Sequence, residues 1–322
     1  VMTSKRTKIK WSALRRLTIS MTVLAAVVFP MLSSAQVPGR FYWKSLSGGN
    51  GVPVIFQSIS GNANPFDSAN TVTPGAEIDA SMAIVGYAHN FTLLDRSATA
   101  AILMPMGRLS GELLFAGETV KESSQGFGDP MLEFDINVIG PKSQKSLSDA
   151  LRYEPGFSLD LLADLALPIG PYDNNQSLNL GQNRWYGRIR VPGRRTTLEF
   201  LPAVWLFGDN DDFGGKTLQT DPMFQLDAHL TRDLTAHLWG SLDGTWYQGG
   251  KATIDGVSGE KLNNVGVGLT LGYTVNENLN MTVGYKSTVN DSDPTDLRMD
   301  NFMLTLVYGW HPLVEGARRL GE

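Results

Sequence analysis

The sequence contains no cysteine, which excludes disulfide bonds and thiolate chemistry. Histidine is almost as scarce, so few side chains could act as a general base or a metal ligand. The four histidines are His89, His229, His237 and His311. No glycine-rich phosphate loop precedes a predicted helix, because the glycine pairs at 214–215 and 249–250 lie in turn-like segments. We therefore predict neither an enzyme nor a bound cofactor.

A long apolar run occurs once, at residues 17–32, after a segment with six basic residues. Small residues follow it at 33–35, as expected at a processing site. This pattern is typical of a secretory signal peptide at residues 1–35, cleaved after Ala35. An N-terminal membrane anchor is the alternative, and it is disfavoured because the run is short and Pro30 interrupts it.

The remaining sequence is acidic and has no further apolar run of transmembrane length. Residues 36–322 contain 21 basic and 32 acidic residues, which gives a net charge of −11. An excess of acidic residues argues against a nucleic-acid partner. An exported chain of this kind is either soluble or a transmembrane β-barrel, in which alternation hides the lipid-facing residues.

Apolar and polar side chains alternate along many segments of about ten residues, the length of a strand that crosses a bilayer at a tilt. In GFGDPMLEFDINV at 126–138, Leu132, Phe134 and Ile136 interleave with Glu133 and Asp135. Successive side chains of a strand point to opposite faces, so one face is acidic and the other apolar. Twelve strands are predicted, with ten and fourteen as alternatives. They lie at 51–60, 79–90, 97–106, 129–138, 157–167, 183–191, 196–206, 224–230, 234–246, 265–274, 279–286 and 302–310.

The connections between these strands alternate between long and short, as do the extracellular loops and periplasmic turns of outer-membrane barrels. The exception is 139–155, which is long where a turn is due, and its SQKSLSDALRYE stretch predicts a small helix outside the membrane. No linker divides 36–322, so one domain is predicted. Two flanking segments complete it: 36–49, whose FYW triplet suggests a plug or a periplasmic segment, and 311–322, a C-terminal tail.

The apolar face is predicted to meet lipid. Twelve strands enclose a lumen too wide for side chains to fill, so an apolar interior would leave a dry void. The opposite face carries charges that are costly in lipid. Aromatic side chains also gather at strand ends on the apolar face, as in an interfacial girdle: Trp246, Tyr273, Tyr285, Tyr308 and Trp310. The predicted fold is an all-β, transmembrane, antiparallel up-and-down β-barrel, and a soluble β-sandwich or barrel is the alternative.

With the apolar face in lipid, charged side chains of three successive strands line the lumen. The acidic ones are Asp129, Glu133, Asp135, Asp160 and Asp164, and the basic ones are Arg184, Arg188 and Arg190. Successive strands are neighbours in an up-and-down barrel, so an acidic wall would stand beside a basic one. Two interpretations are open: ion pairs that brace the barrel, or a transverse field at a constriction that orients solutes.

A weaker constellation includes Asp227, His229, His237 and Ser241, on two strands joined by a short turn. Both histidines are predicted to lie near each other on the lumen face. A hydrolase would need one of them against a serine, and a metal site there would match no known ligand spacing. Acidic loops at 208–212 and 290–296 carry oxygen ligands suited to calcium, although solvated loops are the simpler interpretation.

Two short motifs carry a resemblance to a known family. GFGDP at 126–130 and LNLGQNRW at 178–185, each opening a strand, resemble the MetA-pathway phenol-degradation family of outer-membrane proteins. The resemblance covers most of residues 50–310. It implies an outer-membrane β-barrel of the transporter type that admits hydrophobic or aromatic compounds, with no catalytic residues. Outer-membrane proteins usually end on an aromatic residue, whereas a tail follows Trp310 here.

The sequence pattern predicts a channel of the bacterial outer membrane for passive or facilitated diffusion, and the resemblance implies that its solutes are small and hydrophobic or aromatic. Its expected partners are outer-membrane lipid, the solutes and the barrel-assembly machinery, and no nucleic acid is expected. A structural or adhesion barrel with a closed lumen is the alternative, and a barrel-embedded hydrolase is a more distant one. The residues neither name the solute nor set the oligomeric state.

Overall fold

The computed structural model describes residues 46–115, 118–140, 142–148, 156–195 and 198–321. The predicted signal peptide at 1–35 and the FYW triplet of the candidate plug lie outside the described residues. Residues 149–154, half of the stretch predicted as a small helix, also lie outside them.

Twelve antiparallel strands close into a barrel, which confirms the predicted fold class. In chain order they are β1 (Asn50–Gly61), β2 (Glu77–Leu93), β3 (Arg96–Phe115), β5 (Met131–Ile139), β6 (Ser158–Ala166), β7 (Tyr186–Arg190) with β8 (Gly193–Arg195), β9 (Leu198–Phe207), β12 (Met223–Asp233), β13 (Leu238–Gly249), β16 (Leu262–Thr274), β17 (Leu279–Thr288) and β18 (Met299–Trp310). Both β7 and β8 pair with β6 and β9, so together they count as one strand of the ring.

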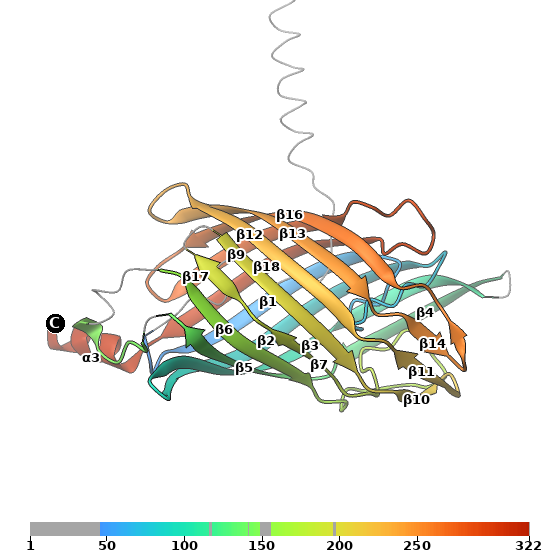
Figure 1. Ribbon diagram of the computed structural model, residues 1–322, viewed down its shortest axis with the longest axis horizontal. Coiled ribbons are helices and arrows are strands. Elements are labelled where there is room, and N and C mark those ends of the chain that lie inside the picture. Colours follow the sequence, from blue (N-terminus) through green and yellow to red (C-terminus); the bar gives the residue numbers. More distant parts are fainter. Residues whose placement is uncertain (1–45, 116–117, 141, 149–155, 196–197, 322) are drawn as a thin grey trace, which may run out of the picture. The chain divides into compact units, whose positions relative to one another are not determined.

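The first and last strands close the ring. β1 pairs with β18 from Asn50 opposite Trp310 to Gly61 opposite Met299, and its other edge pairs with β2. Each strand of the ring therefore has two neighbours, which leaves no open sheet edge in lipid. Figure 1 shows the tilted strands with long connections at one end of the barrel and short turns at the other. We call these ends the loop side and the turn side.

The alternation predicted from the sequence separates the two faces of the sheet. Along β5, Leu132, Phe134 and Val138 are 41%, 38% and 49% exposed, whereas Glu133 and Asp135 are 8% and 5% exposed. The exposed side chains form the outer, apolar surface of the barrel, and the buried acids point inward. This arrangement is that of a membrane barrel, whose outer band is apolar and whose interior is polar.

The loop side contains more strand structure than the sequence predicted. Much of the connection left between the predicted strands 97–106 and 129–138 instead extends β3 and forms β4 (Glu118–Phe127), a hairpin in which Lys121 pairs with Glu112. Leu109 and Leu113 are buried in it, so inward packing continues past the membrane-spanning part of β3. Residues of two other loops form a separate sheet of β10 (Asn210–Phe213), β11 (Lys216–Thr220), β14 (Ala252–Ile254) and β15 (Val257–Ser258).

On the turn side, residues 46–49 are held to the barrel by hydrogen bonds. The Gly48 N–H donates to the carbonyl oxygen of Asn90 at 2.7 Å, and Nε2 of His311 lies 2.9 Å from the carbonyl oxygen of Ser47. The C-terminal tail forms helix α3 (Pro312–Gly321), which the sequence analysis did not predict. Proline suits the first position of a helix because its missing N–H is not needed there.

The length and apolarity needed to span a membrane are found in no helix of the described residues.

Candidate functional site

Four inward-facing side chains share one row across four strands. The register places Glu133 of β5 opposite Asp164 of β6, Asp164 opposite Arg188 of β7, and Arg188 opposite Trp205 of β9. All four side chains are buried. Opposed side chains on one face of a sheet lie about 5 Å apart at Cβ. The row therefore brings two acids, a guanidinium group and an indole ring together.

Asp164 is the centre of the ion pairs in this row. Its Oδ2 accepts hydrogen bonds from Nε of Arg188 at 2.7 Å and from Nη2 of Arg190 at 3.0 Å. Arg190 also reaches Glu133, with 3.5 Å between Nη2 and Oε2. The side chains of Arg190 and Asp164 have no exposed surface, so each charge depends on the other for compensation.

The contacts of this row continue around the interior. The guanidinium carbon of Arg188 lies 4.3 Å from the centre of the Trp205 ring, which is a cation–π contact. Nε1 of Trp205 donates to Oε1 of Gln225 at 2.7 Å, and Nε2 of Gln225 donates to Asp227 at 2.8 Å. The other Asp227 oxygen accepts from Oγ1 of Thr245 at 2.7 Å. We call the whole set the interior belt: Glu133, Asp164, Arg188, Arg190, Trp205, Gln225, Asp227 and Thr245.

Two further predicted acids lie nearer the turn side. Oδ1 of Asp160 accepts a hydrogen bond from Nδ2 of Asn137 at 2.8 Å. Nδ2 of Asn137 also donates to the carbonyl oxygens of Ile139 and Leu159, where the register of β5 and β6 shifts. Asp135 is buried on the inner face of β5. Asn137 therefore connects the ends of the two acidic strands.

Asp129 joins the two motifs that carry the family resemblance. Its carboxylate accepts hydrogen bonds from the backbone N–H of Gly170 at 2.9 Å and of Gln182 at 2.7 Å. Gln182 belongs to LNLGQNRW, so both motifs meet at this carboxylate. A Cβ at Gly170 would lie 2.7 Å from the carbonyl carbon of Gly128, so only glycine allows this approach. Burial raises the pKa of the Asp129 carboxyl more than the backbone donors lower it.

Arg184 does not join the basic wall in which it was predicted. It precedes β7, in the connection 167–185, which we call the lid loop. Its Nη2 donates to Oδ1 of Asp67 at 2.8 Å, and its Nη1 donates to Oγ1 of Thr220 at 2.7 Å. The strand starts only at Tyr186, so strand periodicity does not determine where Arg184 points. Instead Arg184 fastens the lid loop to the connection 62–76 and to β11.

The two histidines predicted to be neighbours lie apart. His229 is buried, and its Nδ1 lies 2.6 Å from Oδ1 of Asp243. Oγ of Ser241 donates to that same Asp243 oxygen at 2.7 Å. His237 is not on the inward face, contrary to the prediction: it is exposed in a turn, with its ring centre 6.4 Å from that of Tyr273. The prediction placed His237 on a strand at 234–246, but that strand, β13, starts only at Leu238, so its alternation does not extend to His237.

Within the described residues, no group of three or more histidine, aspartate or glutamate side chains is placed to hold a metal ion. The acidic loops use their carboxylates locally. In 290–296, Asp293 and Asp296 accept hydrogen bonds from backbone N–H groups of the same loop. Asp212, in 208–212, accepts a hydrogen bond from Asn174 at 2.8 Å.

The described residues form a loop-side chamber and a turn-side chamber in the barrel interior. The loop-side chamber has a volume of about 160 Å³, and the belt residues Glu133, Arg188, Trp205 and Gln225 form part of its wall. The rest of its lining is mainly apolar and aromatic, and includes Ile55, Phe66, Met82, Met131, Leu180, Tyr186, Tyr247 and Met303. The turn-side chamber, of about 380 Å³, has a more polar lining that includes Asn50, Asn90, Ser97, Thr99, Glu133, Asp135 and Asn280.

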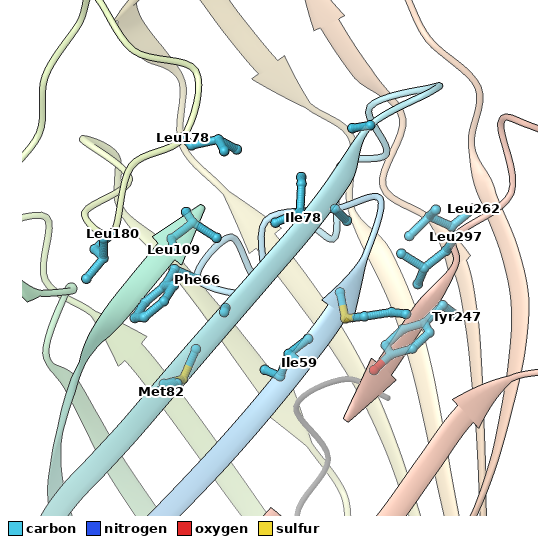
Figure 2. Close-up of a cluster of buried hydrophobic side chains, with 14 of the residues drawn as sticks. Ile59, Phe66, Ile78, Met82, Leu109, Leu178, Leu180, Tyr247, Leu262 and Leu297 are labelled. Atoms are coloured by element: carbon cyan, nitrogen blue, oxygen red, sulfur yellow. The ribbon is translucent and has the colours of Figure 1, made fainter. Parts of the chain in front are cut away.

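Loop residues complete the loop-side interior. Phe66 of the connection 62–76 and Leu178 and Leu180 of the lid loop pack into the cluster of buried apolar side chains shown in Figure 2. Leu180 lies in the LNLGQNRW motif, where alternate leucines were the available signal of burial. These residues were not predicted to face the interior, because a loop has no periodicity that assigns a side chain to one face.

The sequence matches the model of a family described as "Putative MetA-pathway of phenol degradation" over residues 61–306. An outer membrane channel from Pseudomonas putida F1 has a similar structure, with 17% sequence identity and a TM-score of 0.68 over 86% of this chain and 100% of that chain. The β domain of the Bordetella autotransporter BrkA is 11% identical, with a TM-score of 0.44 over 82% of this chain and 100% of that chain. No significant match was found among curated protein sequences.

Proposed function

The chain belongs to the MetA-pathway phenol-degradation family, and from that premise we propose that it is an outer-membrane channel for small hydrophobic or aromatic solutes. The fold is that of an outer-membrane β-barrel, with an apolar outer surface and buried charges inside. The loop side faces the exterior in this proposal and the turn side faces the periplasm, as in other barrels of this type.

The loop-side chamber is the observation that supports the solute class. Its volume is about 160 Å³, and Phe66, Tyr186, Trp205 and Tyr247 contribute aromatic surfaces to it. An engineered apolar protein cavity of about 150 Å³ binds benzene, so the chamber has the size and chemistry for one aromatic ring. A solute would enter between the loops, bind there and leave through the turn-side chamber down its concentration gradient.

A pair of neighbouring residues on β5 provides the test. Met131 lines the chamber, whereas Leu132 points outward and is 41% exposed. We expect Met131→Trp to fill the chamber and remove binding of a single-ring probe, because the added indole occupies its volume. Leu132→Trp adds the same side chain on the lipid side and should leave binding unchanged. Saturation-transfer NMR with phenol and the barrel in nanodiscs measures binding, with empty nanodiscs as the blank.

Uptake of labelled phenol by intact cells that express each variant should follow the same order. Wild-type protein that gives neither a binding signal above the blank nor faster uptake would contradict the proposed function.

A structural barrel with a closed interior is the competing function. The buried interior belt and the apolar packing of the loops favour it, because both fill space through which a solute would pass. Conductance in a planar bilayer separates the two functions. An intact barrel by circular dichroism that conducts no ions and takes up no phenol would support the closed barrel.

The belt also bears on the predicted transverse field. Arg188 and Arg190 lie beside Asp164 in the interior belt. Arg184 instead pairs with Asp67 in the loops, so its charge is not part of the belt. We therefore restrict the field hypothesis to the first two arginines. Phenol uptake that is unchanged when both are replaced by alanine in a folded barrel would contradict it.

A further inference from the structure

The two chambers approach each other at one side chain. Among the described residues that form their linings, Glu133 is the one that the loop-side and turn-side chambers share. It lies on the inner face of β5, a strand paired on both sides, so its backbone is held in place. The side chain of Glu133 therefore lies where the two chambers approach each other, and it can change rotamer while its backbone stays in the sheet.

The ion pairs around Glu133 differ in their contacts. Asp164 accepts two hydrogen bonds from Arg188 and Arg190, at 2.7 and 3.0 Å. Glu133 is 3.5 Å from the same Arg190 nitrogen, longer than a usual hydrogen bond, and it also shares a side-chain hydrogen bond with Asp164. If the Glu133 carboxylate moves away, Arg190 keeps its contact with Asp164. Displacing Glu133 thus leaves no guanidinium group without a carboxylate partner, whereas displacing Asp164 would remove the nearest partner of both arginines.

Small side chains provide space beside Glu133. The residue opposite it on β3 is Ala101, and Thr99 lies opposite Asp135, one inward position nearer the turn side. Thr99 lines the turn-side chamber. A glutamate side chain has three rotatable bonds, so it can change rotamer toward this strand without any change in the backbone.

We propose that Glu133 is the gate between the two chambers. Its carboxylate, held beside Arg190, closes the passage, and a solute moves from the loop-side to the turn-side chamber when this side chain rotates toward β3. Asp164 holds Arg188 and Arg190 in both states, so the remainder of the interior belt stays in place. The role of the gate in solute passage rests on the proposed channel function, but the closure itself is measurable with ions.

The test is single-channel conductance of refolded protein in a planar bilayer. Glu133→Ala removes the gate and should raise the conductance several-fold. Glu133→Gln keeps the shape but weakens the contact with Arg190, and should lengthen the open periods without changing the size of the fully open state. Glu112→Ala is the control, because it removes an exposed acid on the β3–β4 hairpin and should behave as wild type.

A second variant should have the opposite effect on conductance, and it keeps the proposal testable if Glu133→Ala does not fold. Ala101→Leu fills the space toward which Glu133 would rotate, and should shorten the open periods. Each variant is first shown to be folded by circular dichroism and by its heat-dependent migration on gels. Folded Glu133 variants and Ala101→Leu that all conduct like wild type would overturn the gate.

Phenol binding by the same samples distinguishes this failure from a failure of the proposed function. The loop-side chamber is intact in Ala101→Leu, so phenol binding should persist there. Absence of phenol binding in wild type would contradict the solute class, whatever the conductance of the variants shows.

Discussion

A single carboxylate oxygen of Asp164 compensates two buried guanidinium groups, those of Arg188 and Arg190. Removing one partner of a buried ion pair costs far more stability than the intact pair contributes, because an uncompensated charge remains in a low-dielectric site. At this scale the interior of the barrel behaves like a protein core made of polar groups. Its stability depends on each buried charge keeping an opposite charge beside it.

We expect Asp164→Asn to lower the free energy of unfolding by about 3–5 kcal/mol, the cost of breaking a buried ion pair. Urea unfolding in lipid vesicles, followed by tryptophan fluorescence, measures this loss. Asp95→Asn is the matched control. Asp95 pairs with Lys145 at 2.7 Å, but both side chains are more than half exposed, so solvent screens the pair. Equal losses for the two variants would contradict the role assigned to Asp164.

Asp129 has a different function, since its partners are backbone N–H groups of the lid loop. We expect Asp129→Ala to release this loop, because two buried donors lose their charged acceptor, at about 1–3 kcal/mol each. Hydrogen–deuterium exchange of peptides that cover 167–185 should become faster while peptides of β16 and β17 keep their protection. Glu260→Ala, an exposed acid before β16, is the control. Unchanged exchange in the lid loop would show that Asp129 does not hold it.

Among the elements, the lid loop depends most on close backbone approach. Gly128, Gly170 and Gly181 form its contact with the start of β5: a Cβ at Gly181 would lie 2.5 Å from the carbonyl oxygen of Gly170. The loop thus meets the segment before β5, and packs against itself, at distances that only glycine permits. The GFGDP and LNLGQNRW motifs are the two sides of this contact.

We expect Gly170→Ala to cost about 1–3 kcal/mol, as overpacking does in well-packed interiors. The methyl group would meet the Gly128 carbonyl carbon at 2.7 Å and the Asp129 nitrogen at 2.9 Å. Gly156→Ala is the control, because a Cβ there has no described atom within 4 Å. The midpoint of urea unfolding should fall for the first variant alone. A midpoint that is equal in both would mean that the lid loop can move aside.

The strands could be predicted from the sequence because alternation is a local property. The segments 51–60 and 302–310, for example, lie within β1 and β18. Side chains on neighbouring strands, such as Asp164 and Arg188, also meet where the strand order predicts. The pair of Arg184 and Asp67 could not be predicted, because their 117-residue separation depends on how two loops fold over the barrel. The position of His237 was mispredicted for a local reason: it precedes the first residue of β13, the strand to which the alternation had assigned it.

For the whole molecule, the absence of cysteine makes the orientation in the membrane directly measurable. Val257 of β15, on the loop side, is 75% exposed, and Ala236 lies exposed in the β12–β13 turn on the turn side. We expect a membrane-impermeant maleimide to label Val257→Cys in intact cells and to label Ala236→Cys only after the outer membrane is opened. The wild-type chain, which has no thiol, is the blank. Labelling in the reverse order would invert the proposed orientation.

The closure of the ring by β1 and β18 has a consequence for assembly. Gln57 and Met303 lie on adjacent strands although 246 positions separate them in the chain. The entropy cost of joining chain ends rises with the logarithm of their separation, so this joint costs the most to form. Non-local pairings of this kind slow folding. Until the joint forms, two long strand edges stay unpaired and can capture other chains. The same hydrogen-bonded seam that seals the mature barrel is therefore where a newly made chain is most exposed to aggregation.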